Sequence, residues 1–278
     1  MKRTARLLTG ALAALLLLPA LAQAGETLDR VMRTDTLVLA SDPAYPPQSF
    51  LDEDNEWAGF DIDVAREIAN RMGADLEIVT PAWEIITAGR WGGRWDVSVG
   101  SMTPTEQRAK VLDFPAVYYF TPASFAVHED SNITSVDQLN GKTIGVCGGC
   151  TYENYLNKNL VIDAQGAPPF DYKVDPGQIR AYDTDTSAFD DLRLGPGVRL
   201  DAVLSALPTI KEAIDNDYPL QVVGDPVFYE PLSVATDKGD PEFDDRIAEI
   251  VESMRQDGTL KELSMKWYGV DLTTAGGS

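Results

Sequence analysis

The sequence predicts an α/β protein, and its hydrophobic pattern and composition support that class. Short apolar runs rich in β-branched residues alternate with segments of helical period. This alternation is typical of parallel sheets covered by helices. The chain has 278 residues, 44% hydrophobic and 24% charged, which argues against a disordered, collagenous or coiled-coil protein. The predicted strands cover residues 36–40, 76–79, 97–99, 143–146, 202–204 and 220–223.

Two helical patterns are clear in the rest of the chain. Over residues 60–72, apolar residues recur every four positions, acidic residues begin the segment and Gly73 follows it. Residues 243–254 repeat the pattern, and Gly258 separates them from a shorter helix over 260–267. We predict that each helix packs its apolar face on a sheet.

The charge balance and the scarcity of metal-binding residues exclude several functions. Asp and Glu number 44 against 23 Lys and Arg, a net charge of −21, so neither nucleic acid nor an anionic membrane surface is an expected partner. The chain has two cysteines and one histidine, His128, so we expect no zinc cluster, and a His-based triad would have to include His128. We expect neither a metal nor a cofactor.

The first 24 residues have the pattern of a secretory signal peptide. A basic start precedes an apolar run over residues 7–21, and Ala22-Gln23-Ala24 offers a small-residue cleavage motif. A retained membrane anchor is the alternative, but the run is shorter than the roughly 20 residues that span a bilayer. We predict cleavage after Ala24 and a soluble exported protein.

Polar residues that could meet a ligand follow the predicted strand 97–99. Ser101, Thr103 and Arg108 come after its carboxyl end, the edge of an α/β sheet where ligands bind. A proline follows Thr103 and Glu106 lies three residues on, which predicts a helix starting at Thr103. Arg108 would present a planar guanidinium suited to a carboxylate. The alternative is a helix cap and a solvated arginine.

A glycine-rich turn follows the predicted strand 143–146. Its sequence is Cys147-Gly148-Gly149-Cys150-Thr151, with Thr151 as the predicted helix cap. Free backbone N–H groups at a helix start bind anionic groups, and glycines let a ligand approach. The turn has neither the Lys-Ser/Thr of a P-loop nor a G-x-G-x-x-G fingerprint, so nucleotide binding is not expected. A third candidate is Asp201, which precedes the apolar run 202–204 and could equally be a turn residue at the strand edge.

Several motifs follow one another along nearly all of residues 30–270: Asp42-Pro43-Ala44-Tyr45-Pro46-Pro47, Gly59-Phe60-Asp61-Ile62-Asp63-Val64-Ala65, Met102-Thr103-Pro104-Thr105-Glu106-Gln107-Arg108, Gly141-Lys142-Thr143-Ile144-Gly145-Val146, Thr151-Tyr152-Glu153-Asn154-Tyr155-Leu156, Leu200-Asp201-Ala202-Val203 and Gln256-Asp257-Gly258-Thr259-Leu260. In this order, the motifs resemble the periplasmic substrate-binding proteins of ABC importers, in the polar amino acid-binding branch (solute-binding protein family 3).

The resemblance implies a type II periplasmic binding protein fold, in which two α/β lobes joined by two crossing strands close on a ligand. Lobe 1 would comprise residues 25–121 and 227–278, and lobe 2 residues 122–226. The resemblance also implies a periplasmic protein, not an enzyme, that captures an amino acid and delivers it to the membrane permease of an ABC transporter. We expect a monomer.

By motif position, the resemblance assigns the two charged ends of the amino acid. Arg108 would pair with the α-carboxylate, helped by Thr103 and by the backbone and hydroxyl of Thr151. Asp201 would bind the α-ammonium, together with Ser101. A zwitterion leaving water needs both partners, because an unpaired buried charge is costly.

The resemblance also assigns the ligand's side chain. Tyr45 and Trp83 would stack on it, and Asp42 would meet its distal end. With Tyr152 in a side-chain-selecting position, Asp42 favours a cationic or amide amino acid, with a compatible-solute zwitterion as the alternative. The remaining predicted ligand-binding residues are Met102 and Cys150.

Two features depart from the family pattern. Cys147 and Cys150 stand where the family usually has other residues, and in an oxidising compartment we expect a disulfide that stiffens the turn. A thioredoxin-like redox pair is the alternative. Some relatives of this fold are dehydratases acting on cyclic acids, and Glu84 is the acid we would nominate for that function.

Overall fold

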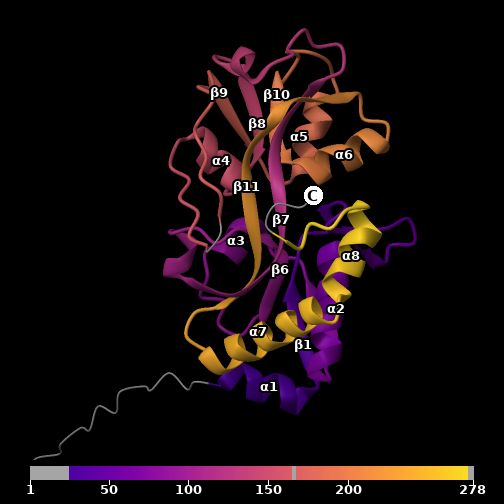
Figure 1. Ribbon diagram of the computed structural model, residues 1–278, viewed down its shortest axis with the longest axis vertical. Helices are drawn as coiled ribbons and strands as arrows, with labels where there is room; N and C mark the ends of the chain where they lie inside the picture. Colours follow the sequence, from indigo (N-terminus) through magenta and orange to yellow (C-terminus); the bar gives the residue numbers. More distant parts are fainter. Residues whose placement is uncertain (1–24, 165–166, 275–278) are drawn as a thin grey trace, which may run out of the picture.

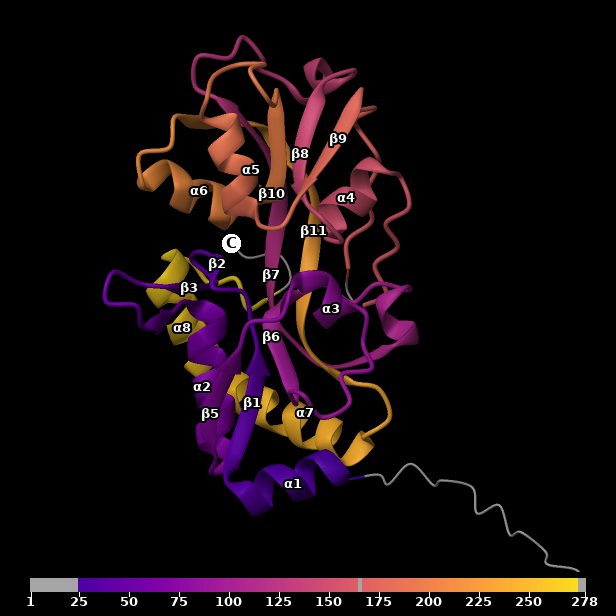
Figure 2. The same cartoon turned by 180° about the vertical axis from the view of Figure 1, so that it is seen from behind.

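The computed structural model describes residues 25–164 and 167–274, so the predicted signal peptide over residues 1–24 lies outside the described part. One mixed sheet of eight strands has the order β5-β1-β6-β11-β7-β10-β8-β9, and a small sheet has the order β2-β3-β4. Helices pack around the large sheet, as Figures 1 and 2 show. The predicted α/β class is therefore confirmed.

The large sheet consists of β1 (Thr36–Ala40), β5 (Asp75–Val79), β6 (Val97–Met102), β7 (Leu112–His128), β8 (Thr143–Cys147), β9 (Gln178–Tyr182), β10 (Ala202–Ala206) and β11 (Leu220–Asp237). The small sheet consists of β2 (Ala44–Tyr45), β3 (Ser49–Leu51) and β4 (Trp57–Ala58). The helices are α1 (Glu26–Thr34), α2 (Phe60–Met72), α3 (Trp83–Thr87), α4 (Thr151–Leu156), α5 (Asp185–Leu192), α6 (Leu207–Asp215), α7 (Pro241–Gln256) and α8 (Thr259–Tyr268), with 3₁₀ turns η1 (Arg108–Lys110) and η2 (Val136–Leu139).

The pairing of the strands divides the sheet into two parallel groups. β1 pairs in parallel with β5 and β6, and β8 pairs in parallel with β9 and β10. β7 and β11 lie between the groups and pair antiparallel with each other. The apolar runs predict parallel sheets and only the first residues of β11. They do not predict β7 or the long antiparallel pairing of β7 with β11.

β7 and β11 connect two lobes, and both strands run through the middle of the molecule in Figure 1. One lobe contains the indigo and purple N-terminal part together with yellow α7 and α8; the other contains the magenta to orange middle of the chain. Each lobe has its own apolar core, around Phe60 and Ile247 in lobe 1 and around Phe125 and Tyr155 in lobe 2. The predicted boundaries at 121/122 and 226/227 remain predictions, because both strands continue through them.

The helices that the apolar period predicts are present. α2 covers residues 60–72, and Gly73 closes it with a left-handed φ of 77° and a backbone N–H that donates to Asn70 O. α7 and α8 are separated at Gly258, whose φ is 89°. A positive φ costs glycine little, so these residues end helices where the chain must turn. α2, α7 and α8 bury their apolar faces in the core of lobe 1.

The predicted helix start at Thr103 is wrong, because residues 103–107 form an irregular turn before η1. The backbone of this turn bonds to a segment of the long loop after α4. Glu106 N–H donates to Val161 O at 3.1 Å, and Asp163 N–H donates to Pro104 O at 2.9 Å. These hydrogen bonds to the strap, as we call residues 161–163, engage the backbone groups of Pro104 and Glu106. They therefore favour an irregular turn over a helix at residues 103–107.

The two lobes are joined by direct hydrogen bonds as well as by β7 and β11. The strap at residues 161–163 joins lobe 2 to the turn of lobe 1, and Thr186 Oγ1 donates to Ala44 O at 2.9 Å. In the described ranges, none of the helices combines the length and apolar character needed to cross a bilayer.

Candidate functional site

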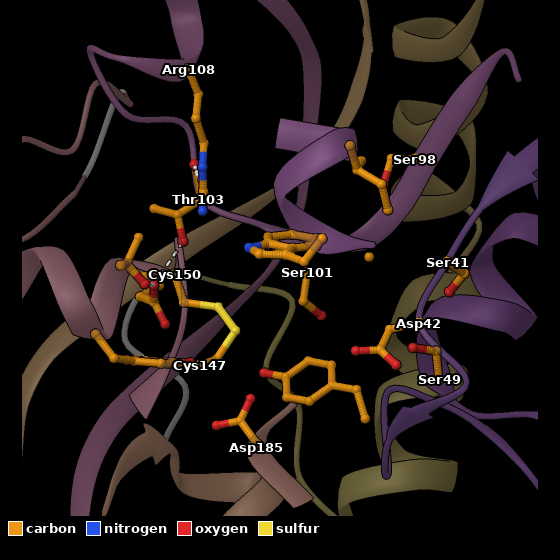
Figure 3. A pocket seen from close by; sticks show the side chains of 17 residues that line it. Ser41, Asp42, Ser49, Ser98, Ser101, Thr103, Arg108, Cys147, Cys150 and Asp185 are labelled. Carbon is orange, nitrogen blue, oxygen red and sulfur yellow. Dashed lines mark hydrogen bonds between the residues drawn. A yellow bond between two sulfur atoms is a disulfide. The ribbon is translucent and has the colours of Figure 1, made fainter. Parts of the chain in front are cut away.

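A pocket lies between the two lobes and collects most of the predicted ligand-binding residues. Its lining includes, from the predicted set, Asp42, Tyr45, Trp83, Ser101, Thr103, Arg108, Cys150, Thr151 and Tyr152. Two unpredicted carboxyl groups, Asp185 and Glu230, also line it. Figure 3 shows Arg108 and Asp185 on opposite sides of the pocket, with Asp42 on a third side. Within the described residues no His, Cys, Asp and Glu side chains are grouped as metal ligands.

Two predicted site residues lie elsewhere. Met102 is fully buried in the core of lobe 1 beside Trp91 and Trp95. Asp201 is held by Thr143, whose backbone N–H donates to Asp201 Oδ2 at 2.8 Å. Asp201 precedes β10, so it lies at the amino end of a parallel strand, whereas the pocket forms at the carboxyl ends. The prediction that Asp201 lines the ligand pocket is wrong.

Asp185 is the lobe 2 carboxyl group that does line the pocket. It is the first residue of α5, directly after β9, and Thr184 caps the helix by accepting from Ser187 N–H at 3.1 Å. Asp185 is 4% exposed, and its Oδ1 has no hydrogen-bond partner among the described residues. Burial raises its pKa to about 7. The signal in the sequence is an acid at the start of a capped helix, and we missed it because β9 was not predicted.

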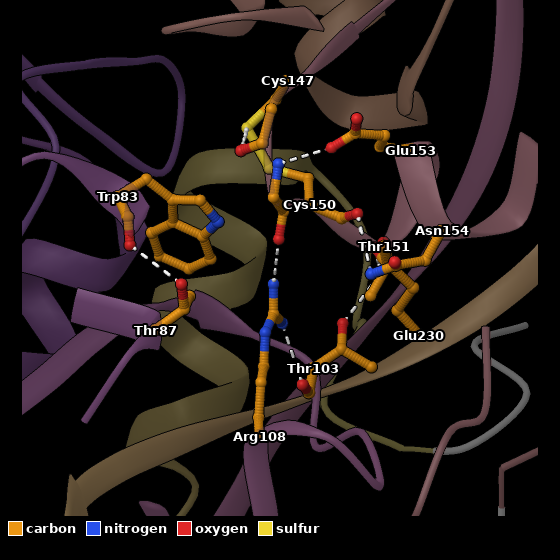
Figure 4. The surroundings of a disulfide bond; sticks show 12 residues. Trp83, Thr87, Thr103, Arg108, Cys147, Cys150, Thr151, Glu153, Asn154 and Glu230 are labelled. Carbon is orange, nitrogen blue, oxygen red and sulfur yellow. Dashed lines mark hydrogen bonds between the residues drawn. A yellow bond between two sulfur atoms is a disulfide. The ribbon is translucent and has the colours of Figure 1, made fainter. Parts of the chain in front are cut away.

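Arg108 reaches from lobe 1 to lobe 2. Nη1 donates to Thr103 O and Nη2 to Gly149 O, each at 3.0 Å (Figure 4). The guanidinium also lies over the indole of Trp83, with Cζ 5.3 Å from the ring centroid. Burial lowers the pKa of Arg108 to about 10, so it stays charged at neutral pH. Both of its hydrogen-bond partners are neutral carbonyls, and Glu230 is the acid whose charge acts on the guanidinium.

Glu230 projects into the same end of the pocket from β11. Its Oε1 accepts from Thr103 Oγ1 at 2.7 Å and from Thr151 Oγ1, so one oxygen is bound by residues of both lobes. The Tyr152 phenol also faces this carboxyl group. Burial raises the pKa of Glu230, while the hydroxyls and Arg108 oppose that rise. No pattern in the sequence indicates Glu230 as a pocket residue, because its position depends on the β7–β11 pairing.

The two cysteines form the predicted disulfide, which lines the pocket at the start of α4. The turn it closes is bonded on both sides: Gly149 N–H donates to Glu153 Oε2 at 2.8 Å, and Gly149 O accepts from Arg108 Nη2 (Figure 4). The helix cap is Cys150 rather than the predicted Thr151, because the Thr151 hydroxyl is directed to Glu230.

Ser101 lies at the end of β6 in a left-handed conformation, with φ of 54°. A buried network holds it there. Ser101 N–H donates to Tyr118 Oη at 2.9 Å, Ser101 Oγ donates to Asp61 Oδ2 at 2.7 Å, and Tyr118 Oη donates to Asp61 Oδ1 at 2.7 Å. Burial raises the pKa of Asp61 to about 7. The Ser101 hydroxyl is thus engaged within lobe 1, which leaves its carbonyl as the group for a ligand.

The remaining pocket wall carries aromatic rings and a third carboxyl group. Tyr45 and Trp83 line the pocket from lobe 1, and Trp83 Nε1 is buried without a hydrogen-bond partner among the described residues. Asp42 accepts from Ala44 N–H at 2.8 Å, and burial raises its pKa. The charges of Asp42 and Glu230 both raise the pKa of Asp185, so the three acids share one electrostatic environment.

Residues 37–270 match the family described as "Bacterial extracellular solute-binding proteins, family 3". The chain is 30% identical over 252 residues to the L-cystine-binding protein TcyJ of Escherichia coli, covering 88% of this chain and 87% of that protein. It is 27% identical to a putative ABC transporter arginine-binding protein of E. coli, covering 84% of this chain and 91% of that protein.

Solved structures give the same result. An ancestral arginine-binding protein bound to arginine has a TM-score of 0.72 and 30% identity, covering 84% of this chain and 99% of that one. The ancestral amino acid-binding protein AncCDT-1, a precursor of cyclohexadienyl dehydratase, has a TM-score of 0.74 and 29% identity, covering 87% and 99%. These neighbours are two-lobed amino-acid-binding proteins, as predicted for this fold. The chain therefore belongs to the bacterial extracellular solute-binding proteins of family 3.

Proposed function

We propose that this protein binds a cationic amino acid between its lobes and delivers it to the permease of an ABC importer in the periplasm. The observation that carries the proposal is the pairing of Arg108 and Asp185 in one pocket, on opposite lobes. Arg108 is a buried cation bonded only to carbonyls in its described surroundings, and Asp185 has an unpartnered buried oxygen. An α-carboxylate and an α-ammonium would satisfy the two groups.

The side-chain preference follows from the pocket's charge. Besides Asp185, which would pair with the α-ammonium, Asp42 supplies a carboxyl group to the pocket, while Arg108 supplies the cation for the α-carboxylate. A ligand with a second positive charge would offset this excess of acid, whereas an acidic side chain would add to it. Arginine and lysine therefore rank first, amide amino acids second, and glutamate and aspartate last.

Binding would be coupled to closure, because no single lobe carries both charged partners. Arg108 comes from η1 of lobe 1, and Asp185 from α5 of lobe 2. A zwitterion would then be stabilised fully only when the lobes are together, which is the differential contact that lets a ligand shift a conformational equilibrium. A permease could recognise this closed form as the loaded one.

A thermal-shift screen of the refolded, ligand-free protein tests the proposal. The panel is L-arginine, L-lysine, L-glutamine, L-cystine, L-glutamate and glycine betaine as a compatible solute. A ligand at a hundredfold excess over its Kd stabilises by about 2.7 kcal/mol. We expect the largest shift with L-arginine or L-lysine and none with L-glutamate. The largest shift with L-glutamate would contradict the charge argument, and a shift with glycine betaine alone would replace the amino acid by a compatible solute.

The dehydratase alternative has less support. Glu84, the acid nominated for it, is exposed and does not line the pocket. The relatives and structural neighbours named above are binding proteins, including the dehydratase precursor AncCDT-1. Binding without turnover is therefore the function we propose, and incubation with prephenate, followed by chromatography, would reveal a product if the protein were an enzyme.

A further inference from the structure

Glu230 is a buried pocket acid for which the proposed contacts with a zwitterion leave no role. It is 1% exposed and lies on a strand that crosses between the lobes. Its Oε1 accepts from Thr103 Oγ1 at 2.7 Å and from Thr151 Oγ1 (Figure 4). These are the hydroxyls at the Arg108 end of the pocket, where the resemblance places the carboxylate of an amino acid.

Each of these hydroxyls has a single hydrogen to donate. Glu230 takes both hydrogens, so neither Thr103 nor Thr151 can donate to a second carboxylate through its side chain. A ligand carboxylate that took either hydrogen would lie two hydrogen bonds from Glu230 Oε1, within about 6 Å. The pocket therefore brings a ligand carboxylate and Glu230 into competition for the same donors.

The charges around Glu230 sharpen this competition. Arg108 of η1 is the cation that faces Glu230. The other titratable groups that face it are neutral or acidic: Tyr152 of α4, Tyr45 of β2 and Asp185 of α5. A ligand carboxylate would place two carboxylates beside one guanidinium in a buried site. Two carboxylates that share a site do not readily ionise together, and the pair then holds a proton.

We infer that Glu230 is a specificity-determining group: a ligand carboxylate binds at Arg108 together with one proton from solvent, which is taken up by the Glu230 carboxylate. The inference rests on the amino-acid function proposed above. Protonation releases the hydroxyl hydrogens of Thr103 and Thr151 to the ligand, and no other bond changes. Glu230 thus selects for ligands whose carboxylate gains enough free energy at Arg108 to offset the cost of protonating Glu230. It also links the binding of these ligands to proton uptake.

Calorimetric titration with L-arginine at pH 7, in phosphate and in Tris, measures the linkage, because the difference in binding enthalpy between buffers gives the number of protons exchanged. Asp185 releases protons when it meets an ammonium, in the wild type and in variants that retain it. We therefore compare wild type with Glu230→Gln. The wild type should take up more protons, by up to one per ligand, and the variant should bind L-arginine at least as tightly.

A merely structural Glu230 gives a different result: Glu230→Gln would weaken binding and leave the proton number unchanged. Equal proton numbers in the two proteins overturn the inference and leave the proposed function standing. Glu129→Gln, at an exposed site beyond the pocket, is the matched control. If Glu230→Gln does not fold, Thr103→Val replaces it. This change removes one hydroxyl that stabilises the Glu230 carboxylate, so Glu230 should already hold a proton before the ligand binds. The number of protons taken up on binding should then be smaller than in the wild type.

The same titration with L-lysine, and then with L-glutamine, follows if L-arginine does not bind. Binding of either with equal proton numbers in wild type and variant also overturns the inference. Absence of binding by all three amino acids contradicts the proposed function itself, and the inference falls with it.

Discussion

Arg108 donates from Nη2 to the carbonyl oxygen of Gly149 at 3.0 Å, and this hydrogen bond joins the two lobes beside the disulfide. Gly149 belongs to the turn closed by Cys147 and Cys150, so a lobe 1 cation is anchored to a covalently restrained part of lobe 2. The Arg108 end of the pocket is therefore built from residues of both lobes.

Replacing Arg108 by Ala should remove most ligand binding. The change leaves a buried ligand carboxylate without its cation, which costs roughly 2–5 kcal/mol. Calorimetric titration with L-arginine measures the loss of affinity. Lys110→Ala is the control, because Lys110 follows in the same short segment but is 66% exposed. A less than tenfold loss of affinity in Arg108→Ala would refute its assignment to the carboxylate.

Asp185 and Asp201 give a paired test of the ammonium site. Asp185→Asn should weaken binding at least tenfold, because the unpartnered buried oxygen that would receive the ammonium loses its charge. Asp201→Asn should leave the affinity unchanged within about threefold, and lower the melting temperature slightly by weakening the bond from Thr143 N–H. The reverse order of effects would restore Asp201 as the ligand's partner.

Reduction of the disulfide should weaken ligand binding more than it weakens the fold. The bond closes a loop with a sequence separation of 3, so it removes little entropy from the unfolded chain. It does restrain the turn that presents Gly149 O to Arg108. We expect the Cys147→Ser/Cys150→Ser variant to lose three- to tenfold in affinity, on the order of 1 kcal/mol. Wild type treated with dithiothreitol should have the same affinity as this variant. The affinity of the variant itself should not change when dithiothreitol is added.

The stability of the protein should fall as the pH rises from 5 to 8, partly because of Asp61. Burial raises the folded-state pKa of Asp61 from 3.8 to about 7, so from pH 5 to about pH 7 the folded protein holds a proton that the unfolded chain has lost. The free energy of unfolding then decreases with pH, by about 3 kcal/mol for this group between pH 5 and 8. Asp61→Asn should flatten the decrease in urea titrations, whereas the exposed control Asp54→Asn should reproduce the wild-type slope.

The sequence alone determined much of the framework of lobe 1. Apolar period and a terminal glycine defined α2 at residues 60–72, because helix formation there depends on local spacing and a local left-handed turn. The strands at 36–40 and 143–146 were equally legible, since buried parallel strands are continuous apolar runs. The order of the motifs also predicted five residues that line the pocket: Arg108, Thr103, Thr151, Tyr45 and Asp42.

Tertiary structure decided the rest, because these features depend on segments distant in the chain. Residues 103–107 have helix-start signals, yet their backbone bonds to the strap at 161–163 instead. Asp201 and Asp185 are both acids beside strands, and only the direction of the strands shows which one reaches the pocket. Glu230 becomes a pocket residue through the antiparallel pairing of β7 with β11, which brings its carboxyl group to Thr103 and Thr151. Local pattern encodes elements and motifs, whereas the meeting of charges from two lobes follows from how the lobes close.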